Sequence, residues 1–103
     1  MVDGKGDGMT VLSGPLFKEQ LREILEPMVL NHPESAKSFK LYLDTILLNL
    51  PTKASKYKPS IYFDDPNVRD IEHQGYTIPF YYDENQKAFA LLGIIDNRSQ
   101  MVN

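Results

Sequence analysis

Prolines divide the first half of this 103-residue chain into two helical segments. Pro15 and Pro33 each precede a stretch of helical periodicity, and a proline fits the first turn of a helix because the N–H that it lacks would have no partner there. Pro51 ends the second segment, and Pro27 predicts that the first helix kinks there or ends just before it. Apolar residues recur at helical spacing in both segments, so the sequence predicts two amphipathic helices in an antiparallel hairpin.

The last third of the chain has the alternating pattern of a β-sheet. Residues 68–73 are expected to pair with residues 76–82 across a tight turn at Gln74-Gly75. Residues 88–95 form a nearly continuous apolar run, which predicts one central strand covered by the helices. Pro79 can donate no ladder hydrogen bond, so we expect a bulge or an unpartnered side of the strand there.

A short strand over residues 9–13 would add to the far edge of this sheet. The predicted fold is α+β with the order β-α-α-β-β-β, in which a helical hairpin packs on one face of a small, mostly antiparallel sheet. We expect one domain of residues 9–99, between a flexible arm or expression remnant (residues 1–8) and a tail (residues 100–103). The predicted core joins apolar residues of the helices to those of the strands: Leu21, Ile24, Leu25, Phe39, Leu43 and Ile46 with Ile78, Phe89, Leu91 and Ile95.

Composition argues against several classes of function. The chain has no cysteine and two histidines, so a transition-metal site would rest mainly on carboxylates, and we predict neither metal nor cofactor. The net charge of −3 argues against a surface built for nucleic acid. Residues 88–95 are the longest apolar run and are too short to span a bilayer, and residues 1–8 lack the apolar segment of a signal peptide. We expect a cytoplasmic protein that does not bind membranes.

Several segments carry a resemblance to a known family. Residues 33–39 are similar to the start of the second helix of the RelE/ParE superfamily of bacterial toxins, and residues 43–51 to the end of that helix. Residues 68–82 resemble the second and third strands, in which an arginine precedes the turn and a Tyr-x-Ile-x-aromatic strand follows it. Residues 88–98 match a final strand that ends in a basic residue, so the resemblance spans roughly residues 9–99.

The resemblance implies the toxin of a type II toxin–antitoxin system, held by an antitoxin that wraps an extended and helical segment around it. RelE-like members cut messenger RNA on the ribosome, whereas ParE-like members bind DNA gyrase and block it. The long helical hairpin looks more like the ParE branch. We therefore expect a ParE-like toxin that binds a protein target and is not an enzyme. The alternatives are a RelE-like, ribosome-dependent mRNA endonuclease and a non-toxic binding module that keeps the fold.

The polar candidates for a catalytic role are few. RNA cleavage needs cations that hold the scissile phosphate and a group that moves a proton. Arg69 matches the arginine that the family places before the turn, and its alternative role is an ion pair with a neighbouring carboxylate (Asp70, Glu72 or Asp96). Arg98 matches the family's terminal basic residue, with a solvated surface position as the alternative. His73 is the third candidate, as a proton shuttle beside the turn, although a lone histidine is more often structural.

Partner contacts are expected from two other groups of residues. Lys53, Lys56 and Lys58 surround Tyr57 in a long connection over residues 51–66, where they would contact an anionic partner or form a solvated loop. Aromatic residues of this connection and of the 76–82 strand form the second group, for which we expect exposed anchors: Tyr62, Phe80, Tyr81 and Tyr82. Either a loop of this chain or the antitoxin would cover the second aromatic face. A homodimer is the expected alternative when no antitoxin is present.

Overall fold

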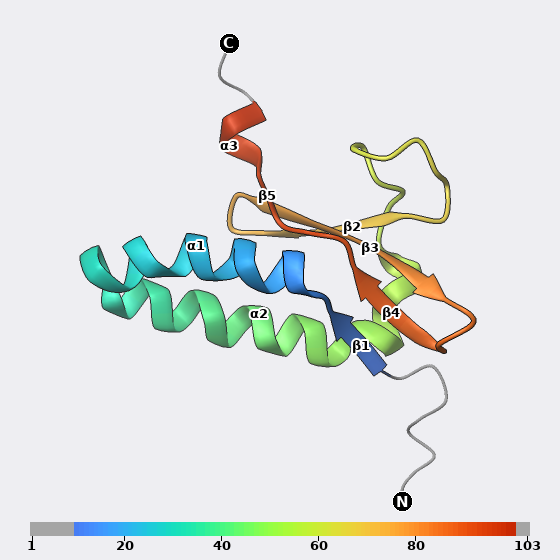
Figure 1. Ribbon diagram of the computed structural model, residues 1–103, viewed down its shortest axis with the longest axis horizontal. Helices are drawn as coiled ribbons and strands as arrows, with labels where there is room; N and C mark the ends of the chain where they lie inside the picture. The colour runs from blue at the N-terminus through green and yellow to red at the C-terminus, as the bar shows by residue number, and fades with distance from the viewer. Residues whose placement is uncertain (1–9, 101–103) are drawn as a thin grey trace, which may run out of the picture.

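The computed structural model describes residues 10–100 and orders them as an α+β domain (Figure 1). The predicted arm of residues 1–8 lies outside this range, as does the tail beyond residue 100. The elements are β1 (Thr10–Ser13), α1 (Pro15–Asn31), α2 (Pro33–Lys53), the 3-10 helix η2 (Ala54–Lys56), β2 (Arg69–His73), β3 (Tyr76–Asp83), β4 (Ala88–Leu91), β5 (Ile95–Asp96) and α3 (Asn97–Gln100). The predicted order is confirmed, with the last strand divided in two.

The strands form a mixed sheet in the order β1-β4-β3-β2, and β5 pairs with β3 beyond the end of β4. The β2–β3 and β3–β4 pairs are antiparallel, whereas β1 joins the edge of β4 in parallel. The turn between β2 and β3 has positive φ at both central residues, Gln74 (50°) and Gly75 (89°), as a type I′ hairpin requires. The helical hairpin packs on one face of the sheet, so the predicted architecture is confirmed.

Both helices run past their internal prolines. The α1 helix continues through Pro27 to Asn31, so of the two expectations, a kink at Pro27 or an end before it, the second is wrong. The α2 helix continues two residues beyond Pro51, so the expected end at Pro51 is wrong as well. Packing accounts for this, because Met28 still contacts the core after Pro27 and Ala54 does so after Pro51. Favourable burial outweighs the hydrogen bond that each proline removes. Within residues 10–100, no helix is long and apolar enough to span a bilayer.

The core lies between the hairpin and the sheet. Phe39, Leu43 and Ile78 are almost fully buried, which confirms the centre of the predicted core. Other predicted helical residues pack against it while partly exposed, namely Leu21, Ile24, Leu25 and Ile46. The buried cluster also contains eight residues besides these: Phe17, Leu50, Ile71, Tyr76, Phe80, Phe89, Leu91 and Ile94. The helical contribution comes mainly from α2.

The predicted strand over residues 88–95 is interrupted, so its prediction as one continuous strand is wrong. The ladder ends at Leu91 and resumes at Ile95. Between them the N–H of Ile94 donates to Gln20 Oε1 of α1 at 2.9 Å. A Cβ at Gly93 would lie 2.9 Å from the same oxygen, so glycine permits the close approach of the helix. The side chain of Gln20 on α1 therefore accepts a backbone hydrogen bond that a neighbouring strand would accept in a continuous ladder.

Pro79 lies opposite this interruption. Its carbonyl accepts the N–H of Leu92 at 2.8 Å, which shows that the backbone of Pro79 faces the β4–β5 side of β3. The N–H and C=O of a strand residue point to the same side, so the N–H that proline lacks would have pointed into the gap. The unpartnered side of β3 that we expected at Pro79 therefore faces the break between β4 and β5.

Candidate functional site

The segment between η2 and β2 wraps around the outer edge of the sheet. Tyr57 packs edge-to-face on Phe80, with ring centroids 5.7 Å apart, on the side covered by the helices. The chain then bridges to β2 at Pro59, and the N–H of Ile61 donates to Asp70 Oδ2 at 3.0 Å. In Figure 1 this loop lies on the opposite side of the sheet from α1 and α2.

The loop covers part of the second face of the sheet. Tyr62 Oη donates to Asn97 Oδ1 at 2.8 Å, and Thr77 Oγ1 donates to the same oxygen at 2.8 Å. Thr77 and Pro79 on this face are nearly inaccessible to solvent. We expected either a loop of this chain or the antitoxin to cover the second face of the sheet. Around Thr77 and Pro79, a loop of this chain covers it. Tyr62, predicted as a partner anchor, ties the loop to the start of α3.

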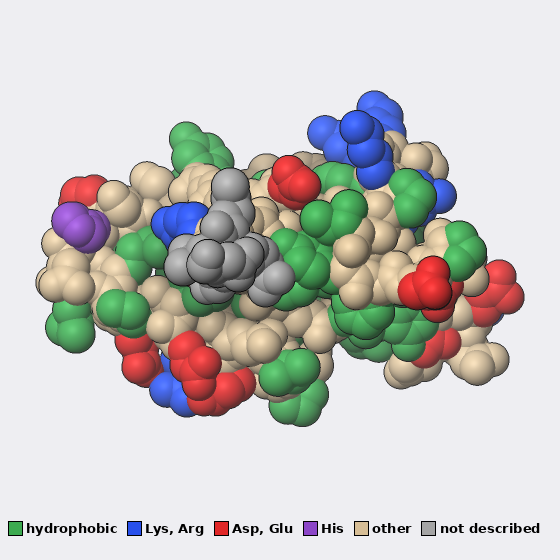
Figure 2. Space-filling model, turned by 90° about the horizontal axis from the view of Figure 1, so that it is seen from above, with side chains coloured by type: hydrophobic (Ala, Val, Ile, Leu, Met, Phe, Trp, Pro, Cys, Tyr) green, Lys and Arg blue, Asp and Glu red, His purple; other side chains and the backbone are tan. Residues whose placement is uncertain are grey.

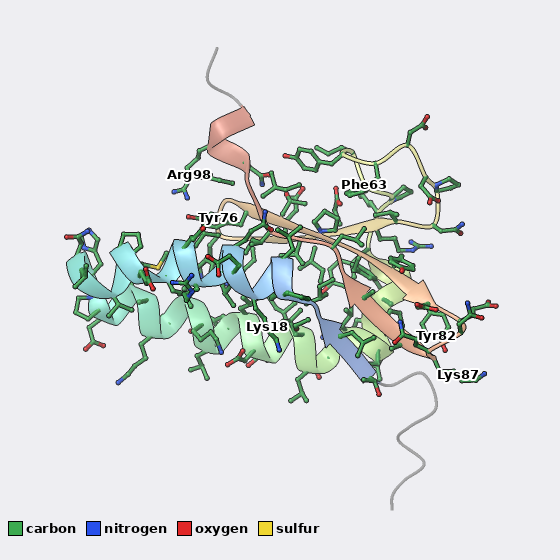
Figure 3. The ribbon with its side chains drawn as sticks, viewed as in Figure 1. Lys18, Phe63, Tyr76, Tyr82, Lys87 and Arg98 are labelled. Carbon is green, nitrogen blue, oxygen red and sulfur yellow. The ribbon has the colours of Figure 1, made fainter. Side chains whose placement is uncertain are left out.

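A cavity of about 550 Å³ lies at the corner where β2 begins and β3 runs on beyond it. It brings together Arg69, Tyr81 and Tyr82, three of the residues predicted for function. Tyr82 is 39% exposed and packs against Phe89 with ring centroids 4.9 Å apart, and Figure 3 shows it at the open end of the sheet. The open corner is therefore a place where an aromatic surface and a cation meet.

Arg69 makes a contact that the sequence did not predict. Its Nη1 donates to the carbonyl oxygen of Tyr57, and it forms no ion pair with any residue in the described range. The carboxylates of Asp65 and Glu84 line the same cavity. The corner thus combines one guanidinium with two carboxylates.

The other two polar candidates lie at the far end of the sheet. His73 ends β2 and is 6% exposed; its Nε2 lies 3.2 Å from the carbonyl oxygen of Phe39, and its ring packs on the Phe39 ring. The rise of about 3.4 Å per strand residue places it about 14 Å from Arg69. Arg98 lies near the His73 end, with its guanidinium 4.9 Å above the Tyr76 ring and its Nε donating to Asp96 (Figure 3). The structure does not bring the three candidates together.

Phe80 corrects the predicted set of surface anchors. It is 1% exposed and contacts Tyr57 and Phe89 in the core, so it offers no surface to a partner in this conformation. Alternation places Phe80 and Tyr82 on the same face of β3, but the helices cover only the first of them. Tyr81 points to the other face and is half-buried.

The lysines predicted for partner contact are all exposed. Lys53 ends α2, Lys56 ends η2, and Lys58 follows in the loop. Lys56 and Lys58 line a second cavity of about 390 Å³ together with Tyr57 and Ile61. Lys56 and Lys58 therefore line a different cavity from the one at Arg69, whose lining includes the neighbouring residues Ala54 and Ser55.

Local contacts change the pKa of several groups. Burial raises the pKa of the Tyr57 phenol above its ordinary value. The hydrogen bond from Arg98 to Asp96 raises the pKa of the arginine, and hydrogen bonds from Gln86 lower the pKa of the Asp83 carboxyl. Across residues 10–100, no three histidine, cysteine, aspartate or glutamate side chains gather in a way that could hold a metal ion.

Two residues of structural weight were missed by sequence reasoning. Asn97 accepts hydrogen bonds from both the loop and the sheet, and nothing in its sequence context distinguishes it from a surface residue. Asp70 is buried beneath the loop at 9% exposure. Because Asp70 alternates with the core residue Ile71, its side chain points to the face of β2 that is turned away from the core. The loop that covers this face has no periodic sequence pattern, so the burial of Asp70 could not be predicted.

Comparison with known proteins identifies related chains. The family model described as the ParE toxin of type II toxin-antitoxin system, parDE, matches residues 12–101. Among solved structures, the chain is similar to one from the chromosomal ParDE toxin–antitoxin system of P. aeruginosa, with 19% identity, a TM-score of 0.67, and coverage of 87% of this chain and 97% of that one. It is also similar to a chain of the RelBE2 toxin–antitoxin complex of Mycobacterium tuberculosis, with 11% identity, a TM-score of 0.58, and coverage of 85% and 96%. None of the curated proteins compared matches the chain significantly.

Proposed function

Because this chain belongs to the ParE toxin family of type II toxin–antitoxin systems, we propose that it acts by binding a protein target, DNA gyrase, and that an antitoxin neutralises it. The proposal concerns how the toxin acts and what it binds, which membership of the family leaves open. Binding rather than catalysis is the activity that the geometry of the sheet favours.

The observation that carries this proposal is the separation of the polar candidates. Arg69 lies at one end of β2, whereas His73 and Arg98 lie at the other end of the sheet. A phosphodiester cleavage site requires cations and a proton-transfer group within reach of one phosphate. The corner that holds Arg69 also contains the carboxylates of Asp65 and Glu84, which would repel RNA. This arrangement supports a protein-binding toxin.

The same corner suits an extended partner segment. β2 begins at Arg69, which pairs with Phe80, so β3 continues past the end of its neighbour. Alternation directs the backbone N–H and C=O of Tyr82 toward this open side. An added strand would pair with these groups while its side chains contact the exposed Tyr82 ring. We propose that the antitoxin binds here and hides the surface that the target would contact.

The experiment measures two activities of the purified toxin. We expect inhibition of DNA supercoiling by gyrase, and no codon-phased cleavage of messenger RNA in a primer-extension assay with ribosomes. Tyr82→Ala should weaken binding of the antitoxin encoded beside the toxin gene, whereas Tyr42→Ala, at an exposed tyrosine of α2, should leave it unchanged. Cleavage that is lost in Arg69→Ala would overturn the proposal in favour of a RelE-like endonuclease.

A further inference from the structure

Resting on the proposed function, we propose that the lysines after α2 form a docking surface for an acidic segment of the antitoxin that also carries an apolar side chain. This lysine surface consists of Lys53, Lys56, Lys58 and the exposed Ile61. Lys56, Lys58 and Ile61 line a cavity beside β2, whereas Lys53 is the last residue of α2. The surface would be a second contact area of the same partner, next to the Arg69 corner.

The lysines of this surface form no salt bridge within the described residues, although Asp70 and Glu72 line the adjoining cavity. Lys53, Lys56 and Lys58 are all exposed. By contrast, Lys40 on α2 is paired with Asp44 at 2.9 Å. In a chain of net charge −3, an unpaired cationic group is a local exception. Figure 2 shows basic side chains projecting together from one edge of the molecule.

An apolar anchor site adjoins the lysines. Lys56 and Lys58 share a cavity of about 390 Å³ with Tyr57, Pro59 and Ile61. Ile61 is 79% exposed although it lies beside this cavity. A partner side chain placed there would remove apolar area from water, while the lysines attract carboxylates on either side of it.

Asp70 distinguishes a peptide from a nucleic acid at this surface. Asp70 is 9% exposed and lines the cavity. Its Oδ2 accepts the N–H of Ile61, whereas the buried Oδ1 has no partner among the described residues. The phosphate backbone of a nucleic acid would be repelled by Asp70 and Glu72, which line the same cavity. A peptide can instead place an apolar side chain and backbone N–H donors there and its carboxylates beside the lysines.

Exposed charges act mainly on the rate of association. Paired charges at a rim steer the encounter of two proteins and are screened by salt, whereas apolar anchors chiefly set the dissociation rate. The lysines and Ile61 should therefore affect different rate constants. This difference allows each part of the surface to be tested separately.

The test measures binding kinetics of the full-length toxin and the antitoxin encoded beside it. The triple variant Lys53→Glu, Lys56→Glu, Lys58→Glu should lower the association rate constant about tenfold at low ionic strength. The dissociation rate constant should stay within about twofold of the parent value. Near 0.5 M salt, the association rate constants of parent and variant should become more alike, because salt screens the charges. The control triple Lys18→Glu, Lys37→Glu, Lys40→Glu changes net charge equally, at exposed positions of the helical hairpin outside the lysine surface and the Tyr82 corner. The control variant should associate with the antitoxin clearly faster than the variant of Lys53, Lys56 and Lys58 does.

Ile61 has its own matched control. Ile61→Ala should raise the dissociation rate constant about tenfold, which corresponds to an apolar anchor, whereas Leu48→Ala should not change it. The two side chains have nearly the same exposure, 79% and 80%, but Leu48 lies on α2 outside the lysine surface. Circular dichroism of each variant verifies that it folds.

The outcomes separate this inference from the proposed function. Absence of any complex with the antitoxin would overturn both. A complex whose association is slowed equally by the two triple variants would overturn the docking surface alone. A 20-nucleotide single-stranded RNA serves as a second probe, and its binding through Lys53, Lys56 and Lys58, with antitoxin binding unaffected, would also overturn the inference.

Discussion

At the scale of single residues, Phe80 and Tyr82 show how position along one strand decides a role. They share a face of β3, but Phe80 lies beneath the helical hairpin, whereas Tyr82 lies past its end. Phe80 is surrounded by Tyr57 and Phe89, and Tyr82 keeps one side of its ring open. The aromatic ring of Phe80 therefore contributes to stability, whereas the ring of Tyr82, two residues later, is available for binding.

We predict losses of stability of different size for truncation of these two rings. Phe80→Ala should lower the free energy of unfolding by about 3–5 kcal/mol, because it removes a buried aromatic ring and leaves a cavity. Tyr82→Ala should cost about 1 kcal/mol, the loss of its contact with Phe89. Urea unfolding of both variants measures the difference, and equal losses would contradict the assignment of Phe80 to the core and Tyr82 to the surface.

Tyr57 should make stability sensitive to alkaline pH. Burial raises the pKa of its phenol in the folded state, so the unfolded chain loses this proton at lower pH than the folded one. The stabilisation is complete below the unfolded pKa near 10 and is lost as pH rises through the folded pKa. Tyr57→Phe should therefore reduce the fall in unfolding free energy between pH 9 and about 11. An identical fall in parent and variant would contradict this.

At the scale of elements, α1 contains an unfavourable residue in its interior. Pro27 is exposed and removes the hydrogen bond to the carbonyl of Glu23, a defect that costs up to about 3 kcal/mol in a helix. Pro27→Ala should raise the free energy of unfolding by about 1–3 kcal/mol. Thermal unfolding measures this gain. Glu23→Ala, an exposed change one turn earlier, is the control and should stay within about 0.5 kcal/mol of the parent.

The wrapping loop depends on Asn97. Asn97→Ala removes the acceptor of both Tyr62 Oη and the buried Thr77 hydroxyl, which should cost about 1–3 kcal/mol. Hydrogen exchange should then quicken in residues 60–67 more than in α1. Tyr62→Phe removes one of the two donors and should have the smaller effect. Unchanged exchange in the loop would show that it is held by other contacts.

These elements also show what a sequence can and cannot predict here. Periodicity located both helices, the β2–β3 turn and the alternating faces of β3, because each depends on local spacing. It did not locate the break after Leu91, since that break depends on Gln20, a residue far away in the chain. It also placed Phe80 at the surface, because alternation assigns residues to faces but does not show where the cover of a face ends. The cavity at Arg69 depends in the same way on a loop without periodicity.

At the scale of the whole molecule, the charges and the polar candidates are distributed rather than collected. Arg69 lies at one corner, Arg98 and His73 at the opposite end, and the lysine surface on a third side. A catalytic site concentrates such groups, whereas a protein that contacts partners over a long path can spread them. The distribution agrees with a toxin whose activity consists of binding.

The parallel pairing of β1 with β4 has a consequence for the synthesis of the toxin. Thr10 pairs with Ala88 and Ser13 with Leu91, so β1 finds its neighbour only among residues made 78 positions later in the chain (88 − 10). A nascent chain leaves the ribosome N-terminus first, and until β3 and β4 emerge it holds a helical hairpin without a sheet to cover. Copies that end before β4 would thus lack the partner of β1 and the Phe89 ring that packs against Tyr82.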